Sequence, residues 1–164
     1  MEVLVRRAKK GDTEAFAKLI LQNEQCMYKI AWSYLKNEED VADVLQETIL
    51  ICFEKLKTLR QDSYFKTWLI RILINQCNNL LRAGKNYGDE DSIRAVEVKE
   101  TGYEECEWKE VLSDLDEKYR VIIMLYYGQK FSIKEISEML ELKQNTVSTR
   151  LARAREQLRK VYQL

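Results

Sequence analysis

Apolar residues recur along almost the whole chain at spacings of three and four, which is the period of an α-helix with one buried face. The chain contains no proline and only five glycines, so few residues interrupt this pattern. The pattern therefore predicts an all-α protein. After a short first helix, we expect helices over residues 13–37, 38–54, 64–82, 106–112, 117–127 and 132–140, a turn over 141–143, and a last helix over 144–160.

Residues 83–103 break the helical period. They hold three of the five glycines, at 84, 88 and 102, together with the acidic triplet at 89–91, and they show little apolar periodicity. We interpret this stretch as a flexible linker. The chain is then divided into two small helical domains, residues 1–82 and residues 104–164.

The last stretch, residues 132–160, has the pattern of two helices joined by a tight turn. Ser132 and Glu135 form a capping-box pair at the start of the first helix. The second helix is strongly basic, because residues 143–164 contain six Lys or Arg and one acidic residue, a local charge of +5. Its apolar side carries Val147, Leu151, Ala154 and Leu158, and its polar side carries Thr149, Arg150, Arg153 and Lys160.

Such a pair of helices is typical of the helix-turn-helix, whose second helix enters the major groove of DNA. Its cations would contact phosphates, and short polar side chains near its N-terminus would contact base edges. The motif is short and permissive. Taken alone, it fits a surface helix with a solvated basic face as well as it fits DNA binding.

The net charge of the chain is zero, but the charge is distributed in blocks of opposite sign. Residues 36–54 carry six acids and one base, and residues 104–117 carry seven acids and one base, giving −5 and −6. Residues 55–82 carry six bases and one acid, giving +5, and the basic helix is also +5. This alternation predicts two nucleic-acid surfaces and two surfaces for other partners.

Two of the blocks contain candidate binding residues. In residues 38–54, Asp40, Asp43, Glu47 and Glu54 form an acidic stripe around Gln46, which spacing alone explains as a solvated helix face. In residues 64–82, amides and arginines lie beside aromatic residues and could bind unstacked bases. We interpret Trp68 as a core residue. The polar residues left for the other faces of this helix are Arg71, Asn75, Asn78, Asn79 and Arg82.

Several classes of chemistry are excluded by the residues that the chain lacks. Without histidine there is no Ser-His-Asp or Cys-His catalysis and no histidine-bearing metal site. The four cysteines, at 26, 52, 77 and 106, form no CxxC pair, and Cys52 and Cys77 are interpreted as core residues. No catalytic residue, cofactor or metal site is predicted.

No segment has the pattern of a signal peptide or of a membrane span. The N-terminal residues lack a long apolar stretch, and the longest apolar run, residues 121–127, is too short to cross a bilayer. We therefore expect a soluble, cytoplasmic protein.

Four segments of the chain together resemble a known family. They are KKGDTEAFAKLI, AWSYLKNEEDVADVLQET, FKTWLIRILINQCNNLLR, and LDEKYRVIIMLYY followed by SIKEISEML and NTVSTRLARAREQLRK. In this order and at these spacings they resemble the bacterial RNA polymerase sigma factors of the extracytoplasmic-function (ECF) type. The resemblance implies that the chain binds core RNA polymerase and directs promoter-specific transcription initiation, without catalysis of its own.

The resemblance also implies roles for particular residues. Residues 1–82 would be sigma region 2, which binds the polymerase and recognises and melts the minus-ten element, and residues 104–164 would be region 4, which binds the minus-thirty-five element. The polymerase-binding residues would be Asp43, Leu45, Gln46 and Glu47. The minus-ten residues would be Arg60, Ser63, Tyr64, Arg71, Asn75, Asn79 and Arg82. The minus-thirty-five residues would be Ser148, Thr149 and Arg153 near base edges, with Arg150 and Arg155 at phosphates.

The implied partners are core RNA polymerase, promoter DNA and an anti-sigma factor, which in this family is commonly membrane-anchored; no small-molecule substrate is implied. The chain departs from the family where Glu141 occupies a turn position that is often glycine, and a positive φ there would cost about 1 kcal/mol. Two other functions fit the pattern. One is a free-standing helix-turn-helix regulator that binds duplex DNA without polymerase, and the other is a helical protein whose basic helix binds a protein partner.

Overall fold

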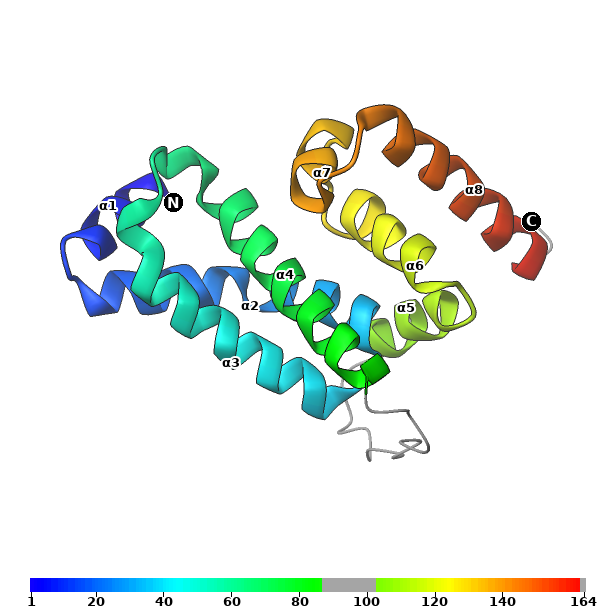
Figure 1. The fold of residues 1–164 in the computed structure, drawn as a ribbon, viewed down its shortest axis with the longest axis horizontal. Coiled ribbons are helices and arrows are strands. Elements are labelled where there is room, and N and C mark those ends of the chain that lie inside the picture. Colours follow the sequence, from blue (N-terminus) through cyan, green and yellow to red (C-terminus); the bar gives the residue numbers. More distant parts are fainter. Residues whose placement is uncertain (87–102, 163–164) are drawn as a thin grey trace.

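The computed structural model describes residues 1–86 and 103–162, and within these residues all regular structure is helical, as the apolar period predicts. Figure 1 shows the helices in two groups, α1–α4 and α5–α8, that lie side by side. The first group comprises α1 (Glu2–Lys9), α2 (Thr13–Leu35), α3 (Glu38–Lys55) and α4 (Phe65–Asn86). The second comprises α5 (Tyr103–Ser113), α6 (Glu117–Ile123), α7 (Ile133–Leu140) and α8 (Gln144–Tyr162).

The first group, which we call the N-terminal module, packs α2, α3 and α4 against one another, with α1 on α2. Its core contains Leu19, Ile30, Phe65, Leu69 and Leu73, each fully buried. Complete burial of a side chain of this size contributes about 1.5–3 kcal/mol, so the core is the main source of the module's stability.

Side chains at the ends of α2 and α3 determine where these helices begin. The Asp12 carboxylate accepts a hydrogen bond of 3.1 Å from the Ala15 N–H, so Asp12 is the N-cap of α2. Asn37 accepts a bond of 3.0 Å from the Asp40 N–H and caps the start of α3, although the sequence suggested that it ends the preceding helix. The left-handed residue that ends α2 is Lys36, with φ of 52°.

The connection from α3 to α4 consists of two short 3-10 turns, η1 (Leu56–Thr58) and η2 (Asp62–Tyr64). Lys9 of α1 fixes this connection, because its ammonium group donates to the Leu59 carbonyl oxygen and to the Asp62 carboxylate, each at 2.6 Å. The loop that precedes α4 is therefore held in a defined position on the module.

The second group, the C-terminal module, contains the helix-turn-helix formed by α7 and α8. The predicted capping box is confirmed: the Glu135 N–H donates to the Ser132 hydroxyl at 3.1 Å, and the Ser132 N–H donates to the Glu135 carboxylate at 2.8 Å. Glu141 ends α7 with φ of 56°, so this non-glycine residue adopts the left-handed conformation. Val147 and Leu151 of α8 are buried against the module, as their spacing predicts.

The helix predicted over residues 117–127 is not uniform. Its α-helical part, α6, ends at Ile123, and the π-helical turn η3 (Met124–Gly128) follows. Gly128 lies close against Met124, and a Cβ atom at this position would approach the Met124 sulfur to 2.6 Å. A larger residue at position 128 would therefore require the Met124 side chain to move.

The two modules are in contact in the structure. α6 packs on α2, and α7 packs on α4. The Arg120 guanidinium is buried at this contact and donates from Nε to the Ser33 carbonyl oxygen at 2.6 Å. Together, these contacts place α7 against α4, the helix that follows the η2 turn.

The predicted linker only partly coincides with what is described. α4 continues to Asn86, four residues into the stretch 83–103, and α5 already begins at Tyr103. Alanine and lysine at 83 and 85 are good helix formers, which explains why α4 continues past Arg82. The remainder of the predicted linker lies outside the described residues. None of the helices in residues 1–86 and 103–162 has the length and apolar character required to cross a membrane.

Candidate nucleic-acid interface

The predicted polymerase-binding residues lie on α3. Asp43, Gln46 and Glu47 are exposed on its outer side, whereas Leu45 is half-buried and packs toward the core. Burial raises the pKa of Asp40, and the nearby Asp43 and Glu39 carboxylates raise it further. The stripe is therefore a concentrated negative surface, which would attract a basic partner.

Two large apolar side chains extend this face and were not predicted as part of it. Leu50 is 57% exposed and Phe53 is 58% exposed. Phe53 lies at the rim of the core and packs edge to face with Phe16, with ring centroids 5.2 Å apart. Positions 43, 46, 47, 50 and 53 recur at steps of three and four, so the helical period could have revealed this face.

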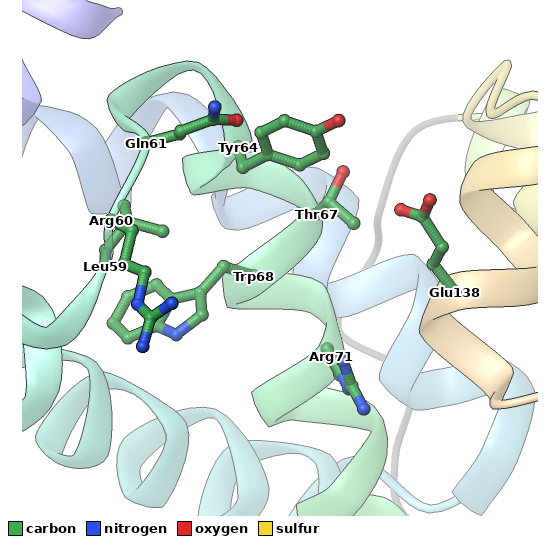
Figure 2. A pocket seen from close by; sticks show the side chains of 8 residues that line it. All are labelled: Leu59, Arg60, Gln61, Tyr64, Thr67, Trp68, Arg71 and Glu138. Carbon is green, nitrogen blue, oxygen red and sulfur yellow. The ribbon is translucent and has the colours of Figure 1, made fainter.

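A cavity of about 460 Å³ lies at the start of α4. Figure 2 shows the side chains around it: Arg60 and Leu59 come from the loop, Tyr64 from η2, Trp68 from the first turn of α4, and Glu138 points in from α7. Of the predicted minus-ten residues, Arg60, Tyr64 and Arg71 line this cavity. Ser63 lines a neighbouring hollow with Tyr64 and Thr67.

Trp68 differs from its prediction as a core residue. It is half-buried, packs with Phe65 at a centroid distance of 6.1 Å, and still forms part of the cavity wall. An aromatic face beside Arg60 and Tyr64 is a surface on which an unstacked base could stack. Sequence reasoning also missed Leu59 and Thr67, because only the tertiary structure turns these side chains toward the same cavity.

The other predicted minus-ten residues lie further along α4. Asn75, Asn79 and Arg82 line a second cavity, of about 450 Å³, which is strongly polar. Its opposite wall is formed by Met139, Leu140 and Glu141 at the end of α7. The structure therefore places the predicted set along one side of α4, divided between two neighbouring cavities that α7 borders.

Acidic side chains of α7 contact this side of α4. The Glu141 carboxylate forms an ion pair with the Arg71 guanidinium, and Glu138 lines the first cavity opposite Arg71. Arg71 and Glu141 are 70 positions apart in the sequence. No sequence pattern could have paired them.

The predicted minus-thirty-five residues lie on α8. Ser148, Thr149, Arg153 and Arg155 are exposed, and the buried side of the helix packs on α6 and α7. The Thr149 hydroxyl donates to the Asn145 carbonyl oxygen at 2.9 Å, so its oxygen remains free to accept a hydrogen bond. Ser148, Arg153 and Arg155 lack partners among the described residues.

Arg150 lies apart from the rest of this set. It is half-buried and close enough to Tyr34 of α2 for its charge to act on the phenol. Burial raises the pKa of Tyr34, and the positive charge of Arg150 opposes this shift. In the present arrangement Arg150 therefore faces the contact between the modules more than the exposed surface of α8.

Comparisons with known proteins cover both modules. The family described as Sigma-70 region 2 matches residues 19–87, and the family described as Sigma-70, region 4 matches residues 107–158. Among curated proteins, the RNA polymerase sigma factor SigV of Bacillus subtilis (strain 168) is 32% identical over 155 residues, which span 92% of this chain and 93% of SigV. The ECF RNA polymerase sigma-E factor of Escherichia coli (strain K12) is 30% identical over 94% of this chain and 90% of its own length.

Solved structures with both modules are also similar to this chain. CnrH, solved in complex with the cytosolic domain of CnrY, superposes with a TM-score of 0.75 at 26% sequence identity, over 99% of this chain and 96% of CnrH. The sigma factor RpoE of Bartonella quintana, solved with the anti-sigma factor NepR, gives a TM-score of 0.75 at 21% identity, over 91% of this chain and 97% of RpoE. The second comparison supports the fold alone.

Proposed function

The chain belongs to the ECF sigma factors of RNA polymerase. From this membership we propose which of its surfaces bind the polymerase and which bind promoter DNA. As a sigma factor it binds core RNA polymerase and directs transcription initiation. Sigma factors are not themselves enzymes, so the polymerase supplies the chemistry. The matches to region 2 and region 4 favour a sigma factor over a free-standing helix-turn-helix regulator and over a helical protein whose basic helix binds a protein partner.

Residues 1–82 form the unit that binds the polymerase and opens the promoter in this proposal. The negative face of α3, with Asp43, Gln46 and Glu47 exposed, would bind a basic or amide-rich surface of the polymerase. Leu50 and Phe53 continue the same face and supply apolar contact area at its end. Leu45 would act indirectly, because it is half-buried and fixes α3 on the module.

The cavity at the start of α4 supports a role in strand opening. A melted base loses its stacking neighbours, and the open state is favoured only when a protein surface replaces them. Arg60, Tyr64 and Trp68 provide a cation and two aromatic faces in one cavity of about 460 Å³. This combination suits one flipped base and its phosphate. Further along α4, Asn75, Asn79 and Arg82 would follow the same strand, and Arg71 would bind its phosphates.

Residues 104–164 would bind the minus-thirty-five element through α8. Ser148, Thr149 and Arg153 are exposed near the N-terminal half of the helix, where recognition helices contact base edges. Arg155 would reach a phosphate, and Arg150 would do so after it leaves the contact between the modules. The stretch 83–103 would act as the linker that lets the two units bind separated elements.

The regulatory partner is proposed from the similar structures. CnrH was solved with CnrY and RpoE with the anti-sigma factor NepR, so we expect this chain to bind an anti-sigma factor as well. A membrane-anchored anti-sigma factor would fit a sigma factor that responds to signals outside the cell. The chain itself would act in the cytoplasm, where polymerase and DNA are found.

The decisive experiment is transcription with purified components. The chain is mixed with core RNA polymerase and a genomic promoter library, and run-off transcripts are sequenced. We expect a small set of transcripts whose promoters share two elements, and no transcription from the core enzyme without the chain. Failure of the chain to bind core polymerase at low ionic strength would refute the proposal.

A further inference from the structure

The acidic side chains of α7 lie along the surface that the proposed function assigns to the minus-ten strand. Glu135, Glu138 and Glu141 recur at steps of three, so they share one side of this helix. Glu135 and Glu138 border the hollow that contains Ser63 and Tyr64. Together we call these carboxylates the acidic edge of α7.

One carboxylate of the acidic edge, that of Glu141, contacts a cation that a DNA strand would need, and Glu138 borders the same surface. Figure 2 shows Glu138 directed across the first cavity toward α4, which presents Thr67 and Arg71 on that side. Glu141 forms an ion pair with Arg71 and borders the second cavity beside Asn75 and Asn79. A phosphate that binds Arg71 would have to displace Glu141.

We infer that α7 is an autoinhibitory element whose acidic edge occupies the single-strand surface of α4, so that the free chain binds the minus-ten strand weakly until the modules separate. The inference rests on the proposed function, because it requires that this side of α4 binds DNA. Carboxylates in the position of phosphates imitate the charge of the strand. The inhibitor is therefore part of the same chain and acts by competition.

A second set of contacts, at the other end of the interface, holds α7 in this position. Lys109 of α5 donates to the Tyr28 hydroxyl at 2.6 Å and to the Glu38 carboxylate at 2.9 Å. Its ammonium group lies 5.0 Å, 5.6 Å and 5.7 Å from the ring centroids of Tyr28, Trp32 and Trp108. Cations over aromatic faces are stabilised when solvent is excluded, so this cluster favours the closed arrangement.

The buried Arg120 adds a further bond across the same interface. It donates to the Ser33 carbonyl oxygen of α2 at 2.6 Å and, within its own module, to the Leu115 carbonyl oxygen at 2.7 Å. Lys36 donates to the Ser113 carbonyl oxygen at 2.8 Å. Polar contacts between the modules can be exchanged for contacts with water, which makes closure compatible with opening by a strong partner.

Two features of the closed arrangement lower the free-energy cost of opening it. The Arg71–Glu141 pair is exposed, with 49% and 66% of the side chains accessible, and exposed pairs contribute little. The buried Trp108 Nε1 also lacks a hydrogen-bond acceptor within the described part of the chain. Separation of the modules would expose this N–H to water. In this inference, polymerase binding supplies the free energy that separates the modules.

The test uses the full chain and neutralises the acidic edge. Glu138→Gln/Glu141→Gln keeps the shape of both side chains but removes their charge, and Glu110→Gln on the exposed side of α5 is the matched control. The probe is a fluorescent single strand from the non-template strand of a promoter that the holoenzyme transcribes. We expect the double variant, without polymerase, to bind this probe about fivefold more tightly than the wild type. Glu110→Gln should match the wild type.

Small-angle X-ray scattering supplies a readout that does not depend on DNA. The double variant should have a larger mean radius of gyration than the wild type, because a fraction of molecules opens. Arg71→Glu should open the chain similarly, and Arg71→Glu/Glu141→Arg, which restores the ion pair with exchanged charges, should close it again. An unchanged radius in both opening variants would overturn the inference.

The outcomes separate this inference from the function on which it rests. If the wild-type holoenzyme binds the probe but the double variant alone gains no affinity, the acidic edge is not inhibitory and the proposed minus-ten surface stands. If the holoenzyme also fails to bind the probe, the assignment of the α4 surface is itself wrong. A gain in probe affinity that is confined to the double variant, together with its larger radius of gyration, supports both the autoinhibition and the proposed minus-ten surface.

Discussion

The Nε atom of Arg120 lies 2.6 Å from the carbonyl oxygen of Ser33, 87 residues earlier in the chain, and donates a buried hydrogen bond across the two modules. Burial lowers the pKa of this guanidinium, which nevertheless stays charged, because an arginine begins far above neutral pH. A single buried cation therefore connects α6 to α2. Mutation of Arg120 therefore tests how the two modules are placed relative to each other.

Removal of Arg120 should destabilise the protein. In Arg120→Ala the carbonyl groups of Ser33 and Leu115 lose their charged donor, and we expect the free energy of unfolding to fall by about 3 kcal/mol. Urea denaturation followed by circular dichroism measures this change. Arg153→Ala, an exposed arginine of α8, should change stability by less than about 0.5 kcal/mol. Equal losses in both variants would contradict the structural role of Arg120.

Lys109→Met should weaken the contact between the modules without unfolding either one. The variant loses the bonds to Tyr28 and Glu38 as well as the contacts with the aromatic rings, and we expect a cost of about 1–2 kcal/mol. Trp32 and Trp108 pack edge to face at 5.0 Å, so near-ultraviolet circular dichroism should report their separation. A spectrum identical to that of the wild type would show that Lys109 does not hold this pair together.

The acidic face of α3 should be required for polymerase binding. Asp43→Lys/Glu47→Lys reverses two exposed charges, so folding should be intact while the affinity for core polymerase falls by about 1–3 kcal/mol. Fluorescence anisotropy of labelled protein titrated with core enzyme measures this affinity. Glu24→Lys, an exposed acidic residue of α2, serves as the control. Unchanged affinity in the double variant would remove this face from the interface.

Arg153 should distinguish base readout from phosphate binding. If Arg153→Ala removes a contact with a base edge, transcription that depends on the minus-thirty-five element should weaken by about 1–3 kcal/mol, a factor of roughly 5 to 150. Run-off transcription on matched promoters with intact and scrambled elements measures the loss. A loss of the same size on both promoters would assign Arg153 to the phosphate backbone.

The buried cysteines should report global unfolding. Burial raises the pKa of Cys52 and of Cys77 to about 12, from an ordinary value of 9.0. Because the folded pKa is the higher one, the protonated thiols contribute stability that is complete below pH 9.0 and is lost as the pH rises toward about 12. At pH 8, a disulfide reagent should modify both thiols only as fast as the chain unfolds, which mass spectrometry can follow. Rapid labelling of native protein would contradict this burial.

The local structure of this chain could be predicted from its sequence because the signals that determine it are local. The period of the apolar residues located the helices, and the Ser132–Glu135 capping box located the start of α7. The alternating blocks of charge distinguished the acidic segments from the basic ones. The candidate residues on α4 and α8 also follow from period and family resemblance. Trp68 was assigned to the core, and it does pack against the core, but it is only half-buried and also lines the cavity, since a helical period does not reveal where the core ends along a helix.

The relation between the two modules was decided only by the tertiary structure. The Arg71–Glu141 pair, the Lys109 cluster and the Arg120–Ser33 bond join residues 70 to 87 positions apart, and none of them belongs to a repeating pattern. Each contact depends on the relative orientation of whole helices, which packing of both modules sets together. The sequence by itself therefore determined which charged, polar and apolar side chains each helix face carries, because these follow from the helical period, and the tertiary structure decided which of these faces pack against each other.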